Sequence, residues 1–220
     1  MVYRTKIPDK ASIASYQSDG RLVAPSAARN ATAIIDLVKR IAPKSGKALE
    51  IASGTGQHIV QLASSLPGVT WSPSDVDADR LKSILVWMED KALPNIKPPY
   101  HLDATEMGWA TRLAQHDFIL LVNLLHLISW NETEILIDEL SNSLTPAGVA
   151  LIYGPFKRKG ELISEGDINF HNSLIETDPD LGYKNDIDMS KMFVQSGLIH
   201  LETVKMPANN LAFVLQKRAS

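Results

Sequence analysis

The sequence predicts an α/β fold, with a doubly wound, mostly parallel sheet covered by helices on both faces. Two observations predict this fold. Apolar segments of strand length alternate with amphipathic segments of helix length along most of the 220 residues, which is typical of parallel sheets with helical connections. A small-residue turn with two glycines, Ser53 to Gly56, separates the first buried strand from the helix after it. Doubly wound sheets bind nucleotide-like cofactors at this turn.

Length and composition indicate a single globular domain over residues 1–220. Apolar residues make up 45% of the chain and charged residues 21%, as in ordinary globular proteins. The net charge of −3 supplies no general attraction to nucleic acids or anionic membranes, so we expect neither as a partner. The longest apolar stretch, Phe118–Ile128, is too short to span a bilayer.

Cysteine and histidine usage bears on metal binding and on compartment. Because the chain contains no cysteine, disulfides and cysteine-ligated metals are excluded. The six histidines show no ligand spacing such as His-x-x-x-His, so we expect no metal. Met1–Lys10 lacks the apolar core of a signal peptide. We therefore expect a cytoplasmic protein.

The first half of the chain is predicted to alternate strands with helices. Residues 1–30 form an N-terminal arm that leads into a first helix, Ser26–Ile41, which has apolar residues at helical spacing and ends before Pro43. The next elements, in order, are strand Ala48–Ala52, helix Gln57–Leu66, strand Val69–Ser74, helix Asp77–Asp90 and the short strand Tyr100–Leu102.

The second half is predicted to add two strands, a lid and a terminal hairpin. Residues 155–186 are polar and rich in turn formers, and so long a stretch in a compact domain is usually a lid or binding loop. The other elements are strand Phe118–Asn123, helix Glu132–Ser143, a turn at Pro146–Gly148, strand Val149–Gly154, helix Met189–Gln195, strand His200–Val204, a turn at Pro207–Asn210 and strand Leu211–Leu215. Together the strands predict a seven-stranded sheet whose last strand is antiparallel.

The turn after the first buried strand carries the strongest functional signal. Gly54 and Gly56 allow sharp turns and leave room for a ligand against the backbone, and the amides at the start of the next helix point toward it. A dinucleotide fingerprint, Gly-x-Gly-x-x-Gly, needs a third glycine at position 59. Ile59 stands there, which disfavours a nicotinamide oxidoreductase because close helix–strand packing is obstructed.

Asp75 is a second candidate for binding a nucleotide-like ligand. It ends the second strand, 21 residues after Gly54, where a carboxylate can accept two hydrogen bonds from a ribose diol. Capping of the next helix is the alternative, since Asp75 and Asp77 both precede it. We assign the ribose to Asp75 and the cap to Asp77.

Three residues near the ends of the fourth and fifth strands are candidates for the substrate side. Asn123 interrupts an apolar strand, so its amide must find partners in a ligand or a neighbouring loop. His126 can orient a substrate or accept a proton, although a histidine beside an apolar run is often structural. Tyr153 can close a pocket or pack in the core.

The chain also resembles known proteins. The run Glu50-Ile51-Ala52-Ser53-Gly54-Thr55-Gly56 resembles motif I of class I S-adenosylmethionine-dependent methyltransferases, and the predicted strand order is similar to theirs. Nearly the whole chain resembles a little-characterised family of S-adenosylmethionine-dependent methyltransferase-like proteins. Its marks, beside motif I, are Pro25–Asn30, Trp71–Asp75, Asn123–Trp130, Tyr153–Phe156 and Asn169–Leu174.

The resemblance implies a three-layer α/β/α fold of the class I methyltransferase type and S-adenosyl-L-methionine as cofactor. Asp103 would face the adenine amino group, the amide of Ala104 a ring nitrogen, and Arg29 the methionine carboxylate. The residues expected to bind the cofactor are Arg29, Asn30, Glu50, Ala52, Ser53, Gly54, Thr55, Gly56, Asp75, Asp103, Ala104 and Asn123. Those expected to act in catalysis are His126, Asn123 and Tyr153.

The function that follows is methyl transfer to an acceptor, which we expect to be a small molecule. The main alternative is a non-catalytic module that binds S-adenosylmethionine and acts through a protein partner. A nucleic-acid methyltransferase is disfavoured by the acidic charge balance. The signature Asn/Asp-Pro-Pro-Tyr is also absent, because Pro98-Pro99-Tyr100 follows Lys97 and enters the third strand.

Overall fold

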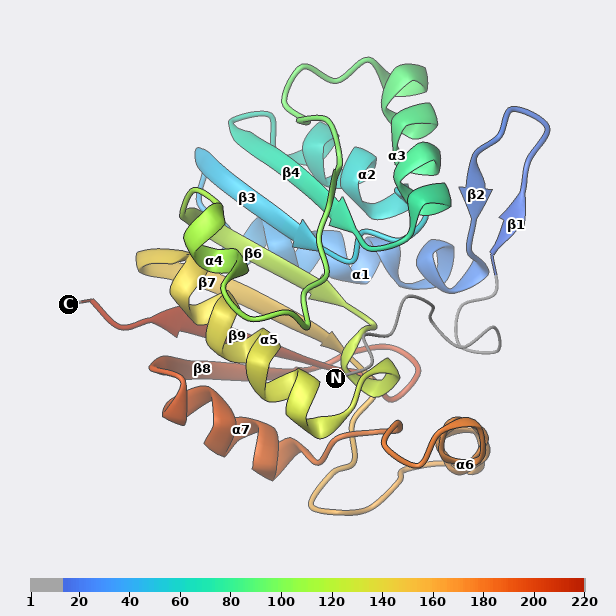
Figure 1. Cartoon of the computed structure of the whole chain (residues 1–220), viewed down its shortest axis with the longest axis vertical. Helices are drawn as coiled ribbons and strands as arrows, with labels where there is room; N and C mark the ends of the chain where they lie inside the picture. Colours follow the sequence, from blue (N-terminus) through green and yellow to red (C-terminus); the bar gives the residue numbers. More distant parts are fainter. Residues whose placement is uncertain (1–13, 220) are drawn as a thin grey trace. The chain divides into compact units, whose positions relative to one another are not determined.

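A computed structural model of the chain describes residues 14–219. A small sheet pairs β1 (Ser15–Tyr16) with β2 (Leu22–Val23). The strands of the main sheet are β3 (Gly46–Ile51), β4 (Val69–Asp75), β5 (Tyr100–His101), β6 (His116–Val122), β7 (Leu144–Gly154), β8 (Leu198–Lys205) and β9 (Leu211–Lys217). Their spatial order is β5-β4-β3-β6-β7-β9-β8 (Figure 1).

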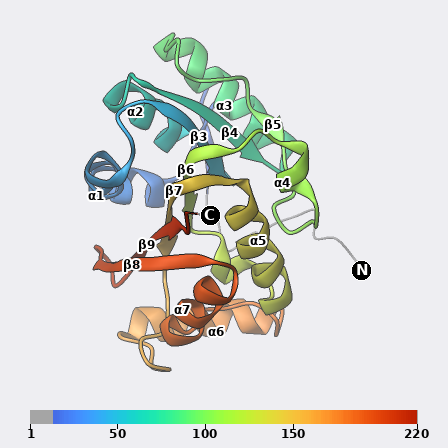
Figure 2. The same cartoon turned by 90° about the vertical axis from the view of Figure 1, so that its left-hand side faces the viewer.

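The main sheet confirms the predicted topology. β3 pairs in parallel with β4, and β4 pairs in parallel with β5. β9 lies between β7 and β8 and is antiparallel to both (Figure 2). The protein therefore has the predicted seven-stranded, mostly parallel sheet with an antiparallel last strand.

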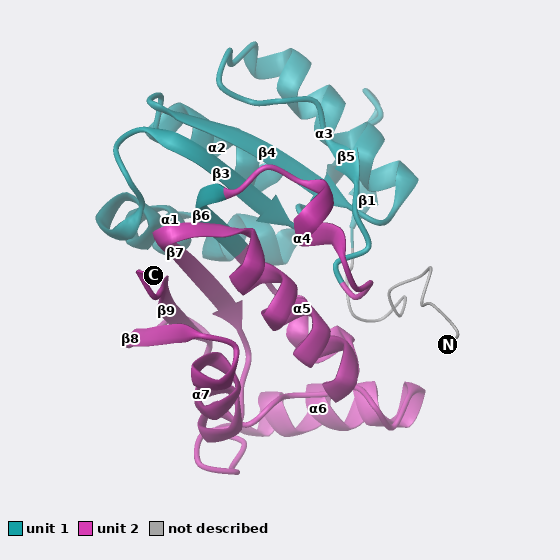
Figure 3. Ribbon diagram, turned by 60° about the vertical axis from the view of Figure 1, so that its left-hand side comes forward, with its two compact units in different colours: residues 1–104, 116–120 teal, residues 105–115, 121–220 magenta. Residues whose placement is uncertain are grey.

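The described elements fall into two compact units (Figure 3). Unit 1 runs to Ala104 and includes His116–Leu120, the first part of β6; unit 2 comprises Thr105–Gln115 and the chain from Leu121. The helices of unit 1 are α1 (Pro25–Ile41), α2 (Gln57–Ser65) and α3 (Ala78–Lys91). Those of unit 2 are α4 (Trp109–Arg112), the 3-10 turn η1 (Leu125–Leu127), α5 (Trp130–Ser143), α6 (Glu165–Thr177) and α7 (Asp186–Gln195).

Unit 1 follows the sequence prediction closely. Its helices form a row in which α2 contacts both α1 and α3, and each begins within one residue of its predicted start. Trp71 of β4 is fully buried and meets Phe118 of β6 edge-on, with ring centroids 6.1 Å apart. The prediction for Met1–Lys10 lies outside the described residues.

The hairpin β1–β2 was not predicted because its strands have two residues each and little hydrophobic alternation. Since α1 already begins at Pro25, the N-terminal arm assigned to residues 1–30 contains this hairpin and the first turn of a helix. The single-domain prediction stays a prediction.

Unit 2 departs from the prediction at one turn and contains the short helix α4, which was not predicted. The turn predicted at Pro146–Gly148 is wrong, because these residues belong to β7, where only Ala147 has a positive φ, 62°. The predicted lid, residues 155–186, contains a regular helix, α6, capped by the hydroxyl of Ser164, which accepts the Asp167 amide. Its apolar positions are too few for periodicity to reveal it, since only Asp167, His171 and Leu174 are buried.

Candidate functional site

The glycine loop, Ala52–Gly56, joins β3 to α2 in unit 1. Three alternate residues have positive φ: Ala52 at 53°, Gly54 at 59° and Gly56 at 92°. The loop is fastened to the neighbouring strand because the Ser53 amide donates to the Ser74 carbonyl at 2.8 Å. α2 begins directly after Gly56, so the predicted strand–turn–helix arrangement is present.

Gly54 and Gly56 are required for different reasons. A Cβ added to Gly56 would lie 3.0 Å from the Ile84 backbone and 3.2 Å from the Trp87 ring, so here the absence of a side chain lets α3 pack against the loop. A Cβ added to Gly54 would meet only the Arg80 guanidinium at 3.5 Å and the Ala52 carbonyl at 4.0 Å among the described residues. The room that the sequence predicted for a ligand therefore lies at Gly54 and not at Gly56.

Asp75 lies beside the loop, as predicted, but it has partners of its own. One carboxylate oxygen accepts the Gly54 amide at 2.8 Å and the other accepts the Asp77 amide at 3.0 Å. Burial raises the pKa of Asp75, while these two hydrogen bonds and the charge of Arg80 oppose the rise. An ionised carboxylate has about four acceptor positions, so capacity for a diol is left and the ribose role stays a prediction.

Asp77 caps α3, as the sequence predicted. Its carboxylate accepts the amides of Asp79 at 2.8 Å and Arg80 at 3.1 Å. Asp77 therefore provides the N-cap of α3, and Asp75 is not needed for capping.

Glu50 is a buried acid at the end of β3. Its side chain is 1% exposed, and its Oε2 has no hydrogen-bond partner among the described residues. Burial raises the pKa of Glu50 to about 8; a hydrogen bond with Ser53 opposes this rise and the charge of Asp75 adds to it. A buried polar atom without a hydrogen-bond partner is rare in native proteins, so the Glu50 Oε2 is a candidate for binding a ligand.

Of the two residues of α1 that were predicted to contact the cofactor, one is buried and the other is exposed. Asn30 is buried, and its Oδ1 lies 2.9 Å from Nε2 of His58 on α2. Burial lowers the pKa of His58 to about 4, so this histidine is neutral at physiological pH. Arg29 is exposed on the same helix. Their roles toward a cofactor stay predictions.

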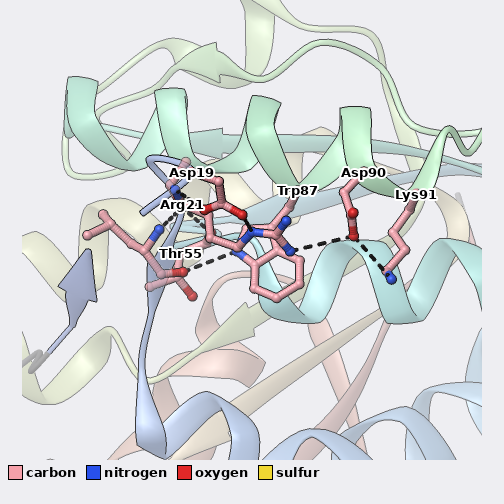
Figure 4. A network of polar contacts seen from close by, with 8 residues as sticks. Asp19, Arg21, Thr55, Trp87, Asp90 and Lys91 are labelled. Carbon is pink, nitrogen blue, oxygen red and sulfur yellow. Dashed lines mark hydrogen bonds and ion pairs between the residues drawn. The ribbon is translucent and has the colours of Figure 1, made fainter. Parts of the chain in front are cut away.

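The N-terminal hairpin is tied to the glycine loop by a network of polar contacts that includes Arg21, Thr55 and Trp87 (Figure 4). The link between hairpin and loop is Ser83. The Ser83 hydroxyl accepts the Leu22 amide and donates to the Thr55 carbonyl, both at 2.7 Å. The Arg21 guanidinium lies 4.5 Å over the Trp87 ring, whose nitrogen donates to the Leu22 carbonyl at 3.1 Å. Sequence reasoning missed this connection because its parts are 28 to 65 residues apart.

Asp103 and Ala104 follow β5 in the same unit. The Leu102 amide donates to the Asp75 carbonyl at 3.0 Å, which holds this segment beside the end of β4. Ala104 is buried and Asp103 is half-buried. Asp103 and Ala104 therefore follow a strand that pairs with the end of β4, where Asp75 lies. Their contacts with an adenine stay predictions.

In unit 2 the structure brings Asn123 and Tyr153 together. Asn123 has a φ of 57° and its amide donates to the Tyr153 carbonyl at 2.9 Å. Asparagine tolerates this conformation better than most residues, which gives the interruption of the apolar strand a structural reason. Tyr153 is 2% exposed, as core packing requires.

His126 lies in η1 and is enclosed by aromatic side chains. It is 4% exposed and meets Phe170 and Tyr183 edge-on, with centroids 5.6 Å and 6.2 Å apart. Its carbonyl accepts the Gly182 amide at 3.0 Å. Burial, together with the charge of Lys184, lowers the pKa of His126 to about 3. The side chain is therefore neutral at physiological pH.

A polar network around α6 was not foreseen as a unit. The Asp167 carboxylate accepts hydrogen bonds from the Tyr183 hydroxyl at 3.3 Å and from the side-chain NH₂ group of Asn209 at 3.0 Å. The Nδ1 of His171 accepts the Tyr183 amide at 3.0 Å. Lys184 is buried, and its ammonium donates to the Ile128 carbonyl at 2.6 Å. The only sequence signal was the polar run Asn169–Leu174, since the partners lie far apart in the chain.

The described part of the chain contains neither a cluster of metal-ligating side chains nor a membrane-spanning helix. No group of three or more histidine, aspartate or glutamate residues among residues 14–219 could hold a metal ion. No helix within the same range is long and apolar enough to cross a membrane.

Comparison with known protein families gives a match over residues 21–217 to the family described as "Protein of unknown function (DUF938)". The chain belongs to this family. The match spans nearly the whole described chain, which confirms the predicted membership of a little-characterised family.

Several solved structures that are similar to this DUF938 chain are methyltransferases. An O-methyltransferase family protein from Burkholderia thailandensis matches with a TM-score of 0.74 at 13% identity, covering 86% of this chain and 57% of its own. An O-methyltransferase family 2 protein from Planctomyces limnophilus in complex with apigenin matches with 0.74 at 16%, covering 87% and 57%. Human N-acetylserotonin methyltransferase in complex with S-adenosylmethionine matches with 0.65 at 14%, covering 79% and 48%.

These similarities show the fold. At such low identity they confirm the predicted class I methyltransferase architecture and leave the chemistry to the site itself. The DUF938 chain spans about half the length of these structures, between 48% and 57%.

Proposed function

We propose that this DUF938 protein binds S-adenosyl-L-methionine and transfers its methyl group to a small-molecule acceptor. The observation that carries the proposal is the room beside Gly54, where an added Cβ would come no closer than 3.5 Å to its nearest neighbour, the Arg80 guanidinium. The Gly54 amide itself donates a hydrogen bond to Asp75. A loop that follows a parallel strand, precedes a helix and leaves one glycine uncovered is suited to lie against a nucleotide-like ligand.

The residues of unit 1 fit this cofactor chemically. Glu50 has a buried carboxyl oxygen without a partner, which suits the ammonium of the methionine part. Asp75 keeps acceptor capacity for the ribose diol, and Asp103 with Ala104 follows the next strand for the adenine. Ala52, Ser53 and Thr55 would contribute loop backbone, while Arg29 and Asn30 would reach the methionine end from α1.

The chemistry of the reaction belongs mostly to the cofactor, because a bound sulfonium makes its methyl carbon electrophilic. The protein orients the acceptor and excludes water. His126 is too weakly basic at its buried position to take a proton near neutral pH, so its contribution is one of shape. Asn123 and Tyr153 stay candidates for contacts with the acceptor. A neutral amine or a phenol ionised in solution would need no protein base.

A small-molecule acceptor is supported by a structural neighbour. The Planctomyces limnophilus protein was solved with apigenin, a small aromatic compound. The net charge of −3 gives this chain no general attraction to nucleic acids.

Calorimetry with S-adenosylmethionine and S-adenosylhomocysteine tests the proposal. We expect both to bind, and we expect Asp75→Ala to abolish binding. Asp77→Ala is the matched control, since it removes a helix cap next to the site and should leave affinity within about twofold while costing about 1 kcal/mol of stability. Failure of the well-folded wild-type protein to bind either compound would refute the proposal.

One observation favours a second function, a cofactor-binding module without catalysis. The residues predicted to act on the acceptor are enclosed by the protein itself, with Tyr153 2% and His126 4% exposed. Methyl transfer to any compound in an acceptor screen would exclude this alternative. Binding of S-adenosylmethionine without transfer, together with capture of a partner that depends on the cofactor, would favour it.

A further inference from the structure

We infer that Glu50 is a proton-exchange group: it is protonated in the free protein and gives up its proton to solvent when a ligand ammonium binds beside it. The inference rests on the proposed function and adds a linkage between cofactor affinity and pH. The step is balanced, because a neutral carboxylic acid and an ammonium become a carboxylate–ammonium pair and one free proton.

The first observation is the isolation of the Glu50 side chain. It is 1% exposed, and its Oε2 has no hydrogen-bond partner in the described part of the chain. The Ser53 hydroxyl beside the carboxyl lowers its pKa, but this hydroxyl donates at 3.1 Å to the Glu50 backbone carbonyl. A carboxylate taken out of water without a counter-charge is strongly disfavoured and becomes neutral instead.

The second observation is the charge of the neighbouring groups. The titratable side chain that acts on Glu50 is another buried acid, Asp75. His58 on the adjacent helix α2 is neutral, because burial lowers its pKa to about 4. Glu50 therefore faces a like charge, and the cation near this pair of acids, Arg80, acts on the pKa of Asp75.

The two acids differ in what stabilises their ionised forms. Asp75 accepts two backbone amides, from Gly54 and Asp77, and lies near the charge of Arg80. Glu50 has only the Ser53 hydroxyl beside it to lower its pKa, and it faces the like charge of Asp75. When both cannot ionise, the proton resides on the acid with fewer donors. Burial raises the pKa of Glu50 to about 8, in agreement with a neutral side chain at pH 6 to 7.

A ligand ammonium would supply the hydrogen-bond donor and the positive charge that the Glu50 carboxyl lacks. It donates to the unpartnered Oε2 and places a positive charge beside the carboxyl, which favours the ionised form. α-Amino groups have pKa values of about 7.7 to 8.0, so below pH 7 the ligand arrives already charged. Glu50 then loses its proton to the buffer, and binding weakens as the solution becomes more acidic.

Calorimetry at pH 6.5 in phosphate and in imidazole buffers measures the released proton, because these buffers differ in ionisation enthalpy. We expect about one proton released with S-adenosylhomocysteine, which has the ammonium without the sulfonium charge. Between pH 6 and 7 the dissociation constant should fall about tenfold. Glu50→Gln, which has the shape of the protonated acid, should show neither the release nor the pH dependence.

A second measurement does not depend on a variant. The infrared band of a protonated carboxylic acid should be present in the free wild-type protein at pH 6.5 and lost on addition of S-adenosylhomocysteine. Binding without proton release, or a band that is absent or unchanged, would overturn the inference while leaving the proposed function intact. Absence of binding by the wild-type protein would instead refute the proposed function, and with it the inference.

Discussion

The carboxylate of Asp75 accepts a hydrogen bond from the Gly54 amide at 2.8 Å. This bond fixes the loop after β3 to the end of β4, so the residue predicted to bind a ribose also shapes the loop that would lie against the ligand. Its other oxygen accepts the Asp77 amide at 3.0 Å. Each oxygen therefore accepts one donor from the protein and keeps a further acceptor position.

Asp75→Asn is expected to impair the loop and the ligand site together. An asparagine presents one oxygen and one NH₂ group, so one of the two backbone amides would face a donor. A buried amide left without an acceptor costs about 1–3 kcal/mol, which chemical denaturation would measure. We expect S-adenosylhomocysteine affinity to fall more than about tenfold, since a tenfold loss corresponds to about 1.4 kcal/mol. Unchanged affinity in a folded variant would exclude Asp75 from the ligand site.

Gly54→Ala and Gly56→Ala form a matched pair with different expected outcomes. Both positions have positive φ, so each alanine pays a backbone cost of about 1–2 kcal/mol. At Gly56 the methyl group would also press on the Ile84 backbone at 3.0 Å, so we expect the larger loss of stability there. At Gly54 it would make only ordinary van der Waals contact, with the Arg80 guanidinium at 3.5 Å, so we expect little further loss of stability but a large loss of ligand affinity. Equal stability losses in the two variants would contradict this assignment.

Sequence periodicity was sufficient for most of the fold. The helices of unit 1 show it because one face of each is buried and its apolar residues recur at a fixed spacing. Inner strands such as β6 are buried on both faces and appear in the sequence as short continuous apolar runs. Asp77 could be assigned as a helix cap because capping is local in sequence. Glycines 54 and 56 could be recognised as a pair, but nothing local indicates that α3 covers one of them.

Contacts between distant segments could not be foreseen. The pair Asn30–His58 looks like two isolated polar residues in sequence, and only the packing of α1 on α2 makes them partners. The prediction of a turn at Pro146–Gly148 failed because proline and glycine are turn formers, whereas here they belong to β7, just before its pairing with β9 begins at Val149. His126 stayed ambiguous, since burial by Phe170 and Tyr183 depends on a helix more than 40 residues away.

His126 is expected to make stability depend on pH. Its pKa is about 3 in the folded protein against an ordinary 6.5, so the unfolded chain takes up the proton at higher pH. The stabilisation is complete above pH 6.5 and is lost progressively as pH falls toward 3. At pH 5 the loss is about 2 kcal/mol. Urea unfolding at pH 7.5 and pH 5 would measure it.

His126→Phe is the comparison for that measurement, because it keeps an aromatic ring against Phe170 and Tyr183 and removes the titration. His58 also has a lowered pKa and contributes in both proteins, so only the difference between them belongs to His126. Identical pH dependence in the wild type and the variant would show that His126 titrates normally in the folded state.

Gly182→Ala is expected to disrupt the network around α6. Gly182 has a φ of 110°, and an added Cβ would lie 2.7 Å from Nδ1 of His171, the atom that accepts the Tyr183 amide. Gly160→Ala is the control, because Gly160 also has a positive φ, 89°, with nothing within 4 Å of an added Cβ. Both variants bear the backbone cost, so the excess loss in Gly182→Ala, about 1–3 kcal/mol, measures the clash and the lost hydrogen bond. If the clash is the cause, adding His171→Ala should make Gly182→Ala cost less than it does alone, a coupling that a double-mutant cycle resolves. Strictly additive effects would show that Gly182 is constrained by its backbone conformation and not by His171.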